Sequence, residues 1–157
     1  MSFRDRIGID LARRVPAEEG VQLAVDNGVR NIDIQTDIAP NAMESFDDAR
    51  CHAVREACEK NDIHLGLHTL SGVKVAEISP FLRNATDEYL KAYIDLAVKL
   101  NAEWIVVHGG YDFTSCKDIR KQASVDRLKR IVGYAEEKDV LLQLENLNNE
   151  PELAEVH

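Results

Sequence analysis

The chain alternates short segments of strand character with longer segments of helical periodicity, and it does so along its whole length. Five segments have the pattern of strands, at residues 4–12, 29–36, 63–70, 104–108 and 140–145. Apolar residues recur at helical spacing in the four segments between them, at residues 16–27, 45–60, 86–101 and 124–135. This alternation predicts a parallel sheet with right-handed crossovers, because each helix must return the chain to the starting edge of the sheet.

Breaker and capping residues set the expected ends of the helices. Pro16 suits the first turn of the first helix, and Gly28 is a natural left-handed stop after it. Thr86 and Ser124 are expected to cap the amino ends of the third and fourth helices, since their hydroxyls can accept a bond from a free backbone amide.

The expected strands have two distinct faces, because successive side chains of a strand point to opposite sides. One face is purely apolar and is assigned to the layer of helices: Ile7, Ile9, Ile32, Ile34, Leu65, Leu67, Ile105, Val107, Leu142 and Leu144. The other face points inward in a barrel of parallel strands, and its last residue in each strand is polar: Asp10, Gln35, His68, His108 and Glu145. Active sites of (β/α) barrels lie at the carboxyl ends of the strands. We therefore expect an α/β fold of the TIM-barrel type, with a doubly wound sheet as the alternative.

Length and charge limit the classes of function. The 157 residues show no linker or change in composition, so we expect a single domain over residues 1–157. A net charge of −9 without any Lys/Arg run argues against a nucleic-acid partner. No apolar run approaches the roughly 18 residues of a membrane span, and the amino terminus lacks the apolar core of a signal peptide. Three cysteines without metal or redox spacing predict reduced thiols and a cytoplasmic protein.

The last expected strand runs through apolar residues into a carboxylate, Glu145. A strand of a parallel sheet is expected to be buried on both faces, and a buried carboxylate is costly without a cation, a metal or hydrogen-bond donors. Glu145 is therefore the first candidate for chemistry. The alternative is a structural carboxylate that accepts hydrogen bonds from loop amides or from an arginine.

Two histidines, His68 and His108, end neighbouring strands in the same way. Imidazole nitrogens and a carboxylate suit a divalent metal such as zinc, manganese, iron or cobalt. A metal there would polarise a carbonyl while Glu145 moves a proton between adjacent carbons. The alternative is that each histidine is a hydrogen-bonded core residue, as is more usual for one histidine at a strand end.

Further polar residues near these strand ends are expected to bind substrate. Asp10, Gln35 and Asn146 would bind hydroxyl groups, and Tyr111, just past a pair of glycines, would contact a ligand. Asp33 is expected to do no more than accept a bond from a helix or loop amide. His64 is expected on the barrel floor and His52 on a solvated helix face, away from the site.

His68, the Val-Val-His-Gly-Gly sequence at 106–110 and the Leu-Glu-Asn sequence at 144–146 resemble the xylose isomerase-like TIM-barrel superfamily. That group includes sugar-phosphate isomerases and epimerases, hydroxypyruvate isomerase, inosose dehydratase and apurinic endonucleases. The resemblance implies that Glu145 binds a divalent metal and serves as acid or base. In the endonuclease branch the residues that match His68, His108 and Glu145 are zinc ligands. In the isomerase branch the matching histidines more often touch substrate.

The chain departs from the family in its number of strands. Family barrels have eight βα units in about 250 residues, and the sequence supplies the first five. The ligands that the family takes from strands six to eight have no counterpart here. We therefore expect a partial barrel, the amino-terminal part of a longer chain, with closure by self-association into a homo-oligomer as the alternative.

The resemblance and the residues together predict a metal-dependent sugar or sugar-phosphate isomerase or epimerase that acts through an enediolate. The expected cofactor is Mn, Zn, Mg or Co, and the expected partner is a small sugar or sugar phosphate. Three alternatives remain: an apurinic endonuclease-like zinc phosphodiesterase, a lyase or dehydratase on the same scaffold, and a non-catalytic subunit that needs a partner to complete its site.

Overall fold

The structure is a computed structural model that describes residues 6–12, 14–110 and 116–145. Its described part contains a five-stranded parallel sheet in the order β1-β2-β3-β4-β5. The strands are β1 (Gly8–Asp10), β2 (Asn31–Gln35), β3 (His64–His68), β4 (Trp104–His108) and β5 (Leu141–Glu145). The helices are α1 (Ala17–Asn27), α2 (Asp48–Asn61), α3 (Arg83–Leu100) and α4 (Lys117–Glu136), with a short 3-10 helix, η2 (Met43–Ser45), before α2.

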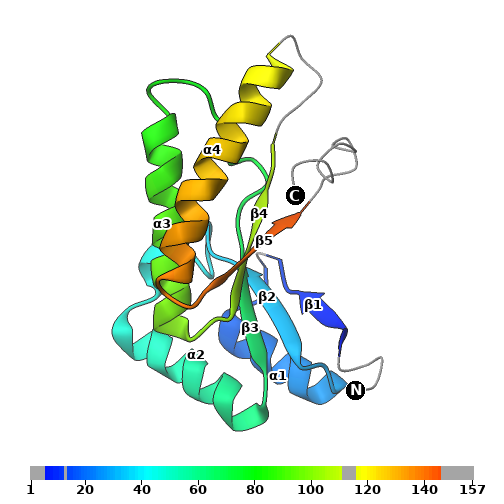
Figure 1. The fold of residues 1–157 in the computed structure, drawn as a ribbon. Coiled ribbons are helices and arrows are strands. Elements are labelled where there is room, and N and C mark those ends of the chain that lie inside the picture. The colour runs from blue at the N-terminus through cyan, green and yellow to red at the C-terminus, as the bar shows by residue number, and fades with distance from the viewer. Residues whose placement is uncertain (1–5, 13, 111–115, 146–157) are drawn as a thin grey trace.

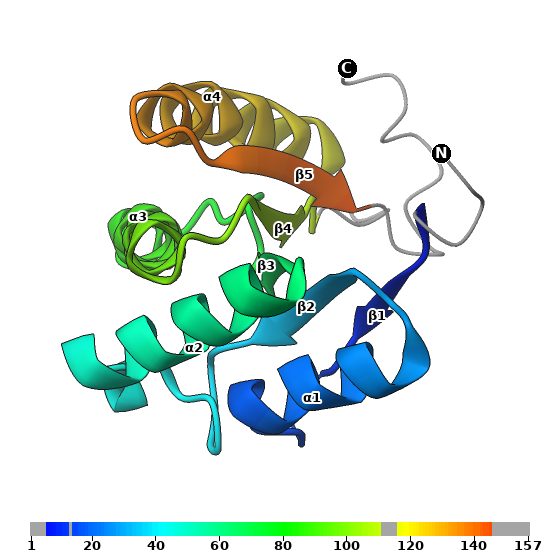
Figure 2. The same cartoon turned by 90° about the horizontal axis from the view of Figure 1, so that it is seen from below.

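The sheet is curved, and α1 to α4 lie along its outer side (Figures 1 and 2). Each helix connects one strand to the next, so all five strands run in the same direction. This arrangement confirms the predicted α/β class and the five parallel units of a partial (β/α) barrel. The carboxyl ends of all the strands therefore meet at one edge of the sheet.

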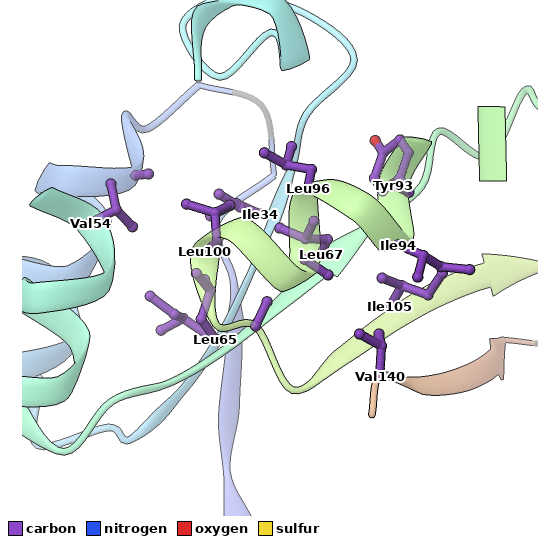
Figure 3. Close-up of a cluster of buried hydrophobic side chains, with 14 of the residues drawn as sticks. Ile34, Val54, Leu65, Leu67, Tyr93, Ile94, Leu96, Leu100, Ile105 and Val140 are labelled. Carbon is purple, nitrogen blue, oxygen red and sulfur yellow. The ribbon is translucent and has the colours of Figure 1, made fainter. Parts of the chain in front are cut away.

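The face that packs on the helices is the predicted apolar face. Ile34 on β2, Leu67 on β3 and Ile105 on β4 have no exposed surface. Figure 3 shows these side chains clustered against Leu96 and Leu100 of α3. Burying a side chain of this size contributes about 1.5–3 kcal/mol, so this interface supplies much of the stability that holds the strand ends in place.

The two edge strands differ from the prediction. β1 is shorter than the expected strand 4–12, and Ile7, assigned to the helix-facing set, precedes it and is 39% exposed. The prediction that residues 140–145 form a strand buried on both faces is wrong, because Leu141 is 60% exposed and Glu145 is exposed too. β5 pairs only with β4, so one side of the strand has no neighbour in the described part of the chain.

One helix ends at the predicted residue, and three helices begin at residues other than those predicted. Gly28 has a left-handed conformation, with φ 63°, and ends α1 as expected. α2 begins later than residue 45, because Asp47 is its N-cap and accepts a bond from the Arg50 amide at 2.8 Å.

Thr86 and Ser124 are not N-caps, since α3 begins at Arg83 and α4 begins at Lys117. Both residues are buried and lie at interior positions of their helices. The Thr86 hydroxyl donates to the Leu82 carbonyl at 3.1 Å. Residues 117–123 contain no glycine or proline, so nothing in them prevents α4 from starting earlier.

Cys51 and Cys58 are buried and form no disulfide with a described residue. None of the helices in the described ranges combines the length and the apolar character that crossing a membrane requires.

Candidate metal centre

The strand register brings the predicted polar residues to one edge of the sheet. Gln35 of β2 pairs with His68 of β3, and His108 of β4 pairs with Glu145 of β5. His68 itself pairs with Val106, so His108 lies one inward position beyond it on the neighbouring strand. Three strands therefore direct an imidazole, a second imidazole and a carboxylate to the same place.

His68, His108 and Glu145 form a compact group. The Nε2 atom of His68 lies 3.0 Å from Oε2 of Glu145 and 3.3 Å from Nε2 of His108. The Nδ1 atom of His108 lies 3.9 Å from the same carboxylate oxygen. One ligand atom from each of the three residues lies within 4.8 Å of the others, so the predicted residues can bind a common cation.

The spacing of these atoms fits a zinc-like ion. Two nitrogens bound to a tetrahedral zinc at ~2.0–2.1 Å are separated by about 3.3 Å, which follows from the tetrahedral angle. The observed 3.3 Å between the two Nε2 atoms agrees with this value. Two nitrogen lone pairs this close repel each other unless a proton or a cation lies between them. The donor set of two imidazoles and one carboxylate is the type that zinc and manganese use.

Buried polar atoms at the centre lack protein partners. His108 is 3% exposed, and its Nδ1 atom has no hydrogen bond within the described part of the protein. The Oε1 atom of Gln35 is also buried without a hydrogen bond from any described residue. A buried polar atom without a partner is costly, so both atoms are suited to interact with a bound ligand or ion.

Carboxylates surround the other side of His68. Its Nδ1 atom lies 3.0 Å from Oδ2 of Asp33 and 3.9 Å from Oδ2 of Asp10. The hydrogen bond to Asp33 raises the pKa of His68 above its ordinary value, against the opposing effect of burial. The charges of Asp33, Asp10 and Glu145 raise this pKa further. The protonated ring is thus favoured when no metal competes for Nε2.

Trp104 forms the floor beneath the group. Gly66 precedes His68 by two residues on the same face of β3 and pairs with Trp104 of β4. A Cβ atom on Gly66 would lie 2.0 Å from Nε1 of the indole ring, so the ring lies directly against this glycine. Trp104 therefore lies on the inward face of the sheet, and a larger residue at position 66 would displace its ring.

Two tyrosines of α3 hold the loop after β2 against the end of β3. Oδ1 of Asp37 accepts a bond from the Tyr89 hydroxyl at 2.7 Å, and Oδ2 accepts one from the Tyr93 hydroxyl at 2.6 Å. The Tyr93 oxygen also lies 3.2 Å from the His68 carbonyl and accepts a bond from the Thr36 amide. Burial raises the pKa of both tyrosines, so they remain protonated donors.

Several residues at the site have no clear signal in the sequence. Asp33 is expected from the sequence only to accept a bond from a backbone amide, although its position two residues before Gln35 places it on the inward face. The sequence pattern places Tyr93 on the apolar stripe of its helix and gives no sign of a contact with Asp37. The spacing of four between Tyr89 and Tyr93 shows that they share a helix face, but not that the face points to Asp37.

Some predicted residues lie elsewhere. His64 and His52 are away from the centre, as predicted: His64 contacts Oε1 of Glu103 at 2.5 Å at the opposite end of the strands, and His52 is exposed on α2. Tyr111 and Asn146 fall outside the described residues.

Comparisons with known proteins agree with this architecture. The sequence model of the family described as "Xylose isomerase-like TIM barrel" matches residues 21–153. No curated protein sequence matches the chain.

Three solved structures show the fold. D-psicose 3-epimerase from Clostridium cellulolyticum H10 is 16% identical with a TM-score of 0.75, and the match covers 90% of this chain and 52% of that one. A D-tagatose 3-epimerase-like protein is 18% identical with a TM-score of 0.74, covering 90% and 53%. The 3-keto-D-glucoside 4-epimerase from E. coli is 13% identical with a TM-score of 0.71, covering 92% and 57%. The chain thus spans about half the length of these structures.

Proposed function

The chain belongs to the xylose isomerase-like TIM-barrel family, and from this premise we propose that it serves a metal-dependent sugar or sugar-phosphate isomerase or epimerase. One observation carries the proposal: the ligand atoms of His68, His108 and Glu145 converge within 4.8 Å at the carboxyl ends of three adjacent strands. The carboxyl end is where barrels of this kind carry out their chemistry. The sugar epimerases among the structural neighbours support the choice of reaction class.

Each residue has a proposed role that follows from its chemistry. His68 and His108 bind the ion through imidazole nitrogens, and Glu145 binds it through a carboxylate oxygen. The metal, when bound, supplies Lewis-acid polarisation of a substrate carbonyl. Glu145 accepts a proton from the carbon next to that carbonyl and returns it, since its exposed carboxylate at the strand end is open to a substrate.

Substrate hydroxyls are proposed to bind beside the metal group. The buried Oε1 atom of Gln35 can accept a hydrogen bond from a hydroxyl group. The Oδ2 atom of Asp10 lies 3.9 Å from Nδ1 of His68 and can accept another. Asn146 and Tyr111 extend this proposed set on the basis of sequence. A small polyhydroxylated substrate suits a site that offers acceptors to several hydroxyl groups.

Metal binding is the first test. Isothermal titration with Mn²⁺, Zn²⁺, Co²⁺ and Mg²⁺ is expected to show one tight site in the wild type and a large loss of affinity in Glu145→Gln. Glu103→Gln is the matched control, because Glu103 contacts His64 at the other end of the sheet. Equal affinity in wild type and Glu145→Gln would reject the proposed centre.

Proton transfer is the second test. The metal-loaded protein is incubated with ketoses and their phosphates in D₂O, and exchange of the hydrogen next to the carbonyl is followed by NMR. We expect exchange in wild type and Glu103→Gln and none in Glu145→Gln. Exchange at the same rate in all three would remove Glu145 from the proposed chemistry.

A zinc phosphodiesterase related to the apurinic endonucleases is the second candidate. The observation that favours it is the pair of Nε2 atoms 3.3 Å apart beside a carboxylate, which suits zinc. The net charge of −9 opposes it, because binding to duplex DNA depends on cationic contacts to phosphate. Cleavage of an abasic duplex by the zinc-loaded protein, lost in His108→Ala, would favour this candidate over the isomerase.

A further inference from the structure

The two ring nitrogens of His68 face different groups. Nε2 faces His108 and Glu145, whereas Nδ1 faces Asp33 at 3.0 Å. A neutral imidazole has a hydrogen on one nitrogen and a lone pair on the other. The neighbours of each nitrogen therefore decide which one can bind a cation.

Asp33 is placed to fix that choice. Its carboxylate accepts hydrogen bonds, so the ring nitrogen that is hydrogen-bonded to it, Nδ1, is the donor. Oε2 of Glu145 also lies 3.0 Å from Nε2, but the Glu145 side chain is 44% exposed, so water competes far more for that carboxylate. The side chain of Asp33 is 17% exposed and that of His68 is 12% exposed, so water competes little for this hydrogen bond. Asp10 is less suited, because its Oδ2 atom is 3.9 Å from Nδ1 and its Oδ1 atom already accepts the Ala12 amide.

The backbone explains why Asp33 reaches His68. Asp33 pairs with Gly66 on the neighbouring strand, and His68 lies two residues further on the same face. The 3.0 Å contact between Oδ2 of Asp33 and Nδ1 of His68 spans this diagonal. The glycine beside Asp33 has no side chain to separate the carboxylate from the ring above it.

We propose that Asp33 is a positioning residue that holds His68 as the Nδ1–H tautomer and so directs the Nε2 lone pair to the His108–Glu145 side. The effect of Asp33 on metal binding rests on the proposed metal centre, whereas its hydrogen bond to His68 does not. Carboxylates hydrogen-bonded to the second nitrogen of a histidine ligand orient the ring and increase its basicity. Asp33 thereby acts on the metal through His68, without binding it.

The tautomer can be measured without any metal. Long-range ¹H–¹⁵N correlation spectra of the metal-free protein distinguish a protonated ring nitrogen from an unprotonated one, and the signal of His68 is assigned from its absence in His68→Gln. At about pH 9, well above the ordinary histidine pKa of ~6.5, we expect Nδ1 to be protonated and Nε2 unprotonated. A wild-type His68 found as the Nε2–H tautomer would overturn the inference.

The Asp33→Asn variant tests the cause. Its amide group can donate to an unprotonated Nδ1, so we expect the Nε2–H tautomer to increase and the affinity for Zn²⁺ to fall 10–100-fold. Asp95→Asn is the charge-matched control, because Asp95 accepts bonds on the outside of α3 from Tyr134 and Lys138. An unchanged tautomer and an affinity equal to that of Asp95→Asn would each contradict the proposed role.

Titration of the variants with Zn²⁺ also distinguishes a positioning role of Asp33 from a role as a metal ligand. Oxygens of Asp10 and Asp33 and a nitrogen of His68 also lie within 4.8 Å of one another. Binding of a Zn²⁺ ion that survives Glu145→Gln but not Asp33→Asn would make Asp33 a ligand and refute the positioning role. A wild-type protein that binds no ion would count against the proposed function, while the tautomer spectra would still decide the role of Asp33.

Discussion

The Nε2 atoms of His68 and His108 face each other at 3.3 Å across the ends of the adjacent strands β3 and β4. The rings are tilted by 32° with centroids 5.2 Å apart, so they meet near their edges and do not stack face to face. Oε2 of Glu145 lies 3.0 Å from Nε2 of His68 and 3.9 Å from Nδ1 of His108, so the carboxylate lies close to both rings. The predictions below follow from this contact and from the groups that hold it.

Removal of either imidazole should abolish tight metal binding. We expect His108→Ala to weaken Zn²⁺ binding by more than about 100-fold, since even the loss of an outer-shell partner costs 10–100-fold. Isothermal titration measures the change. His64→Ala, at the opposite end of β3, should bind as the wild type does; similar losses in the two variants would mean that the effect is structural.

Metal affinity should depend on pH through His68. The pKa of His68 is raised above 6.5, chiefly by the hydrogen bond to Asp33, so its proton competes with metal up to a higher pH than in an ordinary histidine. Affinity for Zn²⁺ should therefore fall as the pH is lowered through this raised pKa. In the metal-free protein the same shift contributes stability below pH ~6.5 that is lost as the pH rises through the folded pKa. A midpoint at or below 6.5, measured by NMR titration, would contradict the expectation.

Gly66→Ala should disturb the floor of the site. The new Cβ would meet the Trp104 ring at 2.0–2.6 Å, so the ring has to move, at a cost of about 1–3 kcal/mol in stability. Trp104 is the one tryptophan of the sequence, and its fluorescence reports the movement directly.

Gly133→Ala provides the opposite control. Nothing lies within 4 Å of a Cβ at this position in α4, and alanine is favoured over glycine in a helix by about 1 kcal/mol. Denaturant unfolding should show Gly66→Ala to be less stable than the wild type and Gly133→Ala to be slightly more stable. Equal stability of both variants would mean that the Trp104 ring yields freely.

Tyr93→Phe should loosen the connection between α3 and the ends of β2 and β3. The phenylalanine ring can occupy the same space, but the bonds to Asp37 and the Thr36 amide are lost. Because Tyr93 is fully buried, we expect a loss of about 1–3 kcal/mol in the free energy of unfolding.

Tyr134→Phe is the matched control for this change. Its hydroxyl also donates to a carboxylate, Asp95, at 2.8 Å, but the bond is exposed and should be worth less. The two variants are compared by denaturant unfolding. An equal effect would indicate that the Asp37 cluster contributes no more than a surface hydrogen bond.

The faces of the strands could be read from the sequence, because side-chain direction alternates with a period of two. Ile34, Leu67 and Ile105 lie on the helix side, and His68 and His108 lie on the other, as their positions predict. Helix starts were harder to predict. Thr86 and Ser124 have capping side chains, but the residues before them are also compatible with a helix, and both helices begin before them.

The sequence by itself determined the parallel order of the sheet and the set of polar residues at its carboxyl edge, since both depend on local periodicity and chain direction. Only the tertiary structure decided that Asp33 reaches His68 and that Tyr93 reaches Asp37, because these contacts join different strands and helices at diagonal positions. It also decided that Glu145 is exposed, because burial of a strand depends on having neighbours on both sides, and β5 pairs on one side only in the described chain.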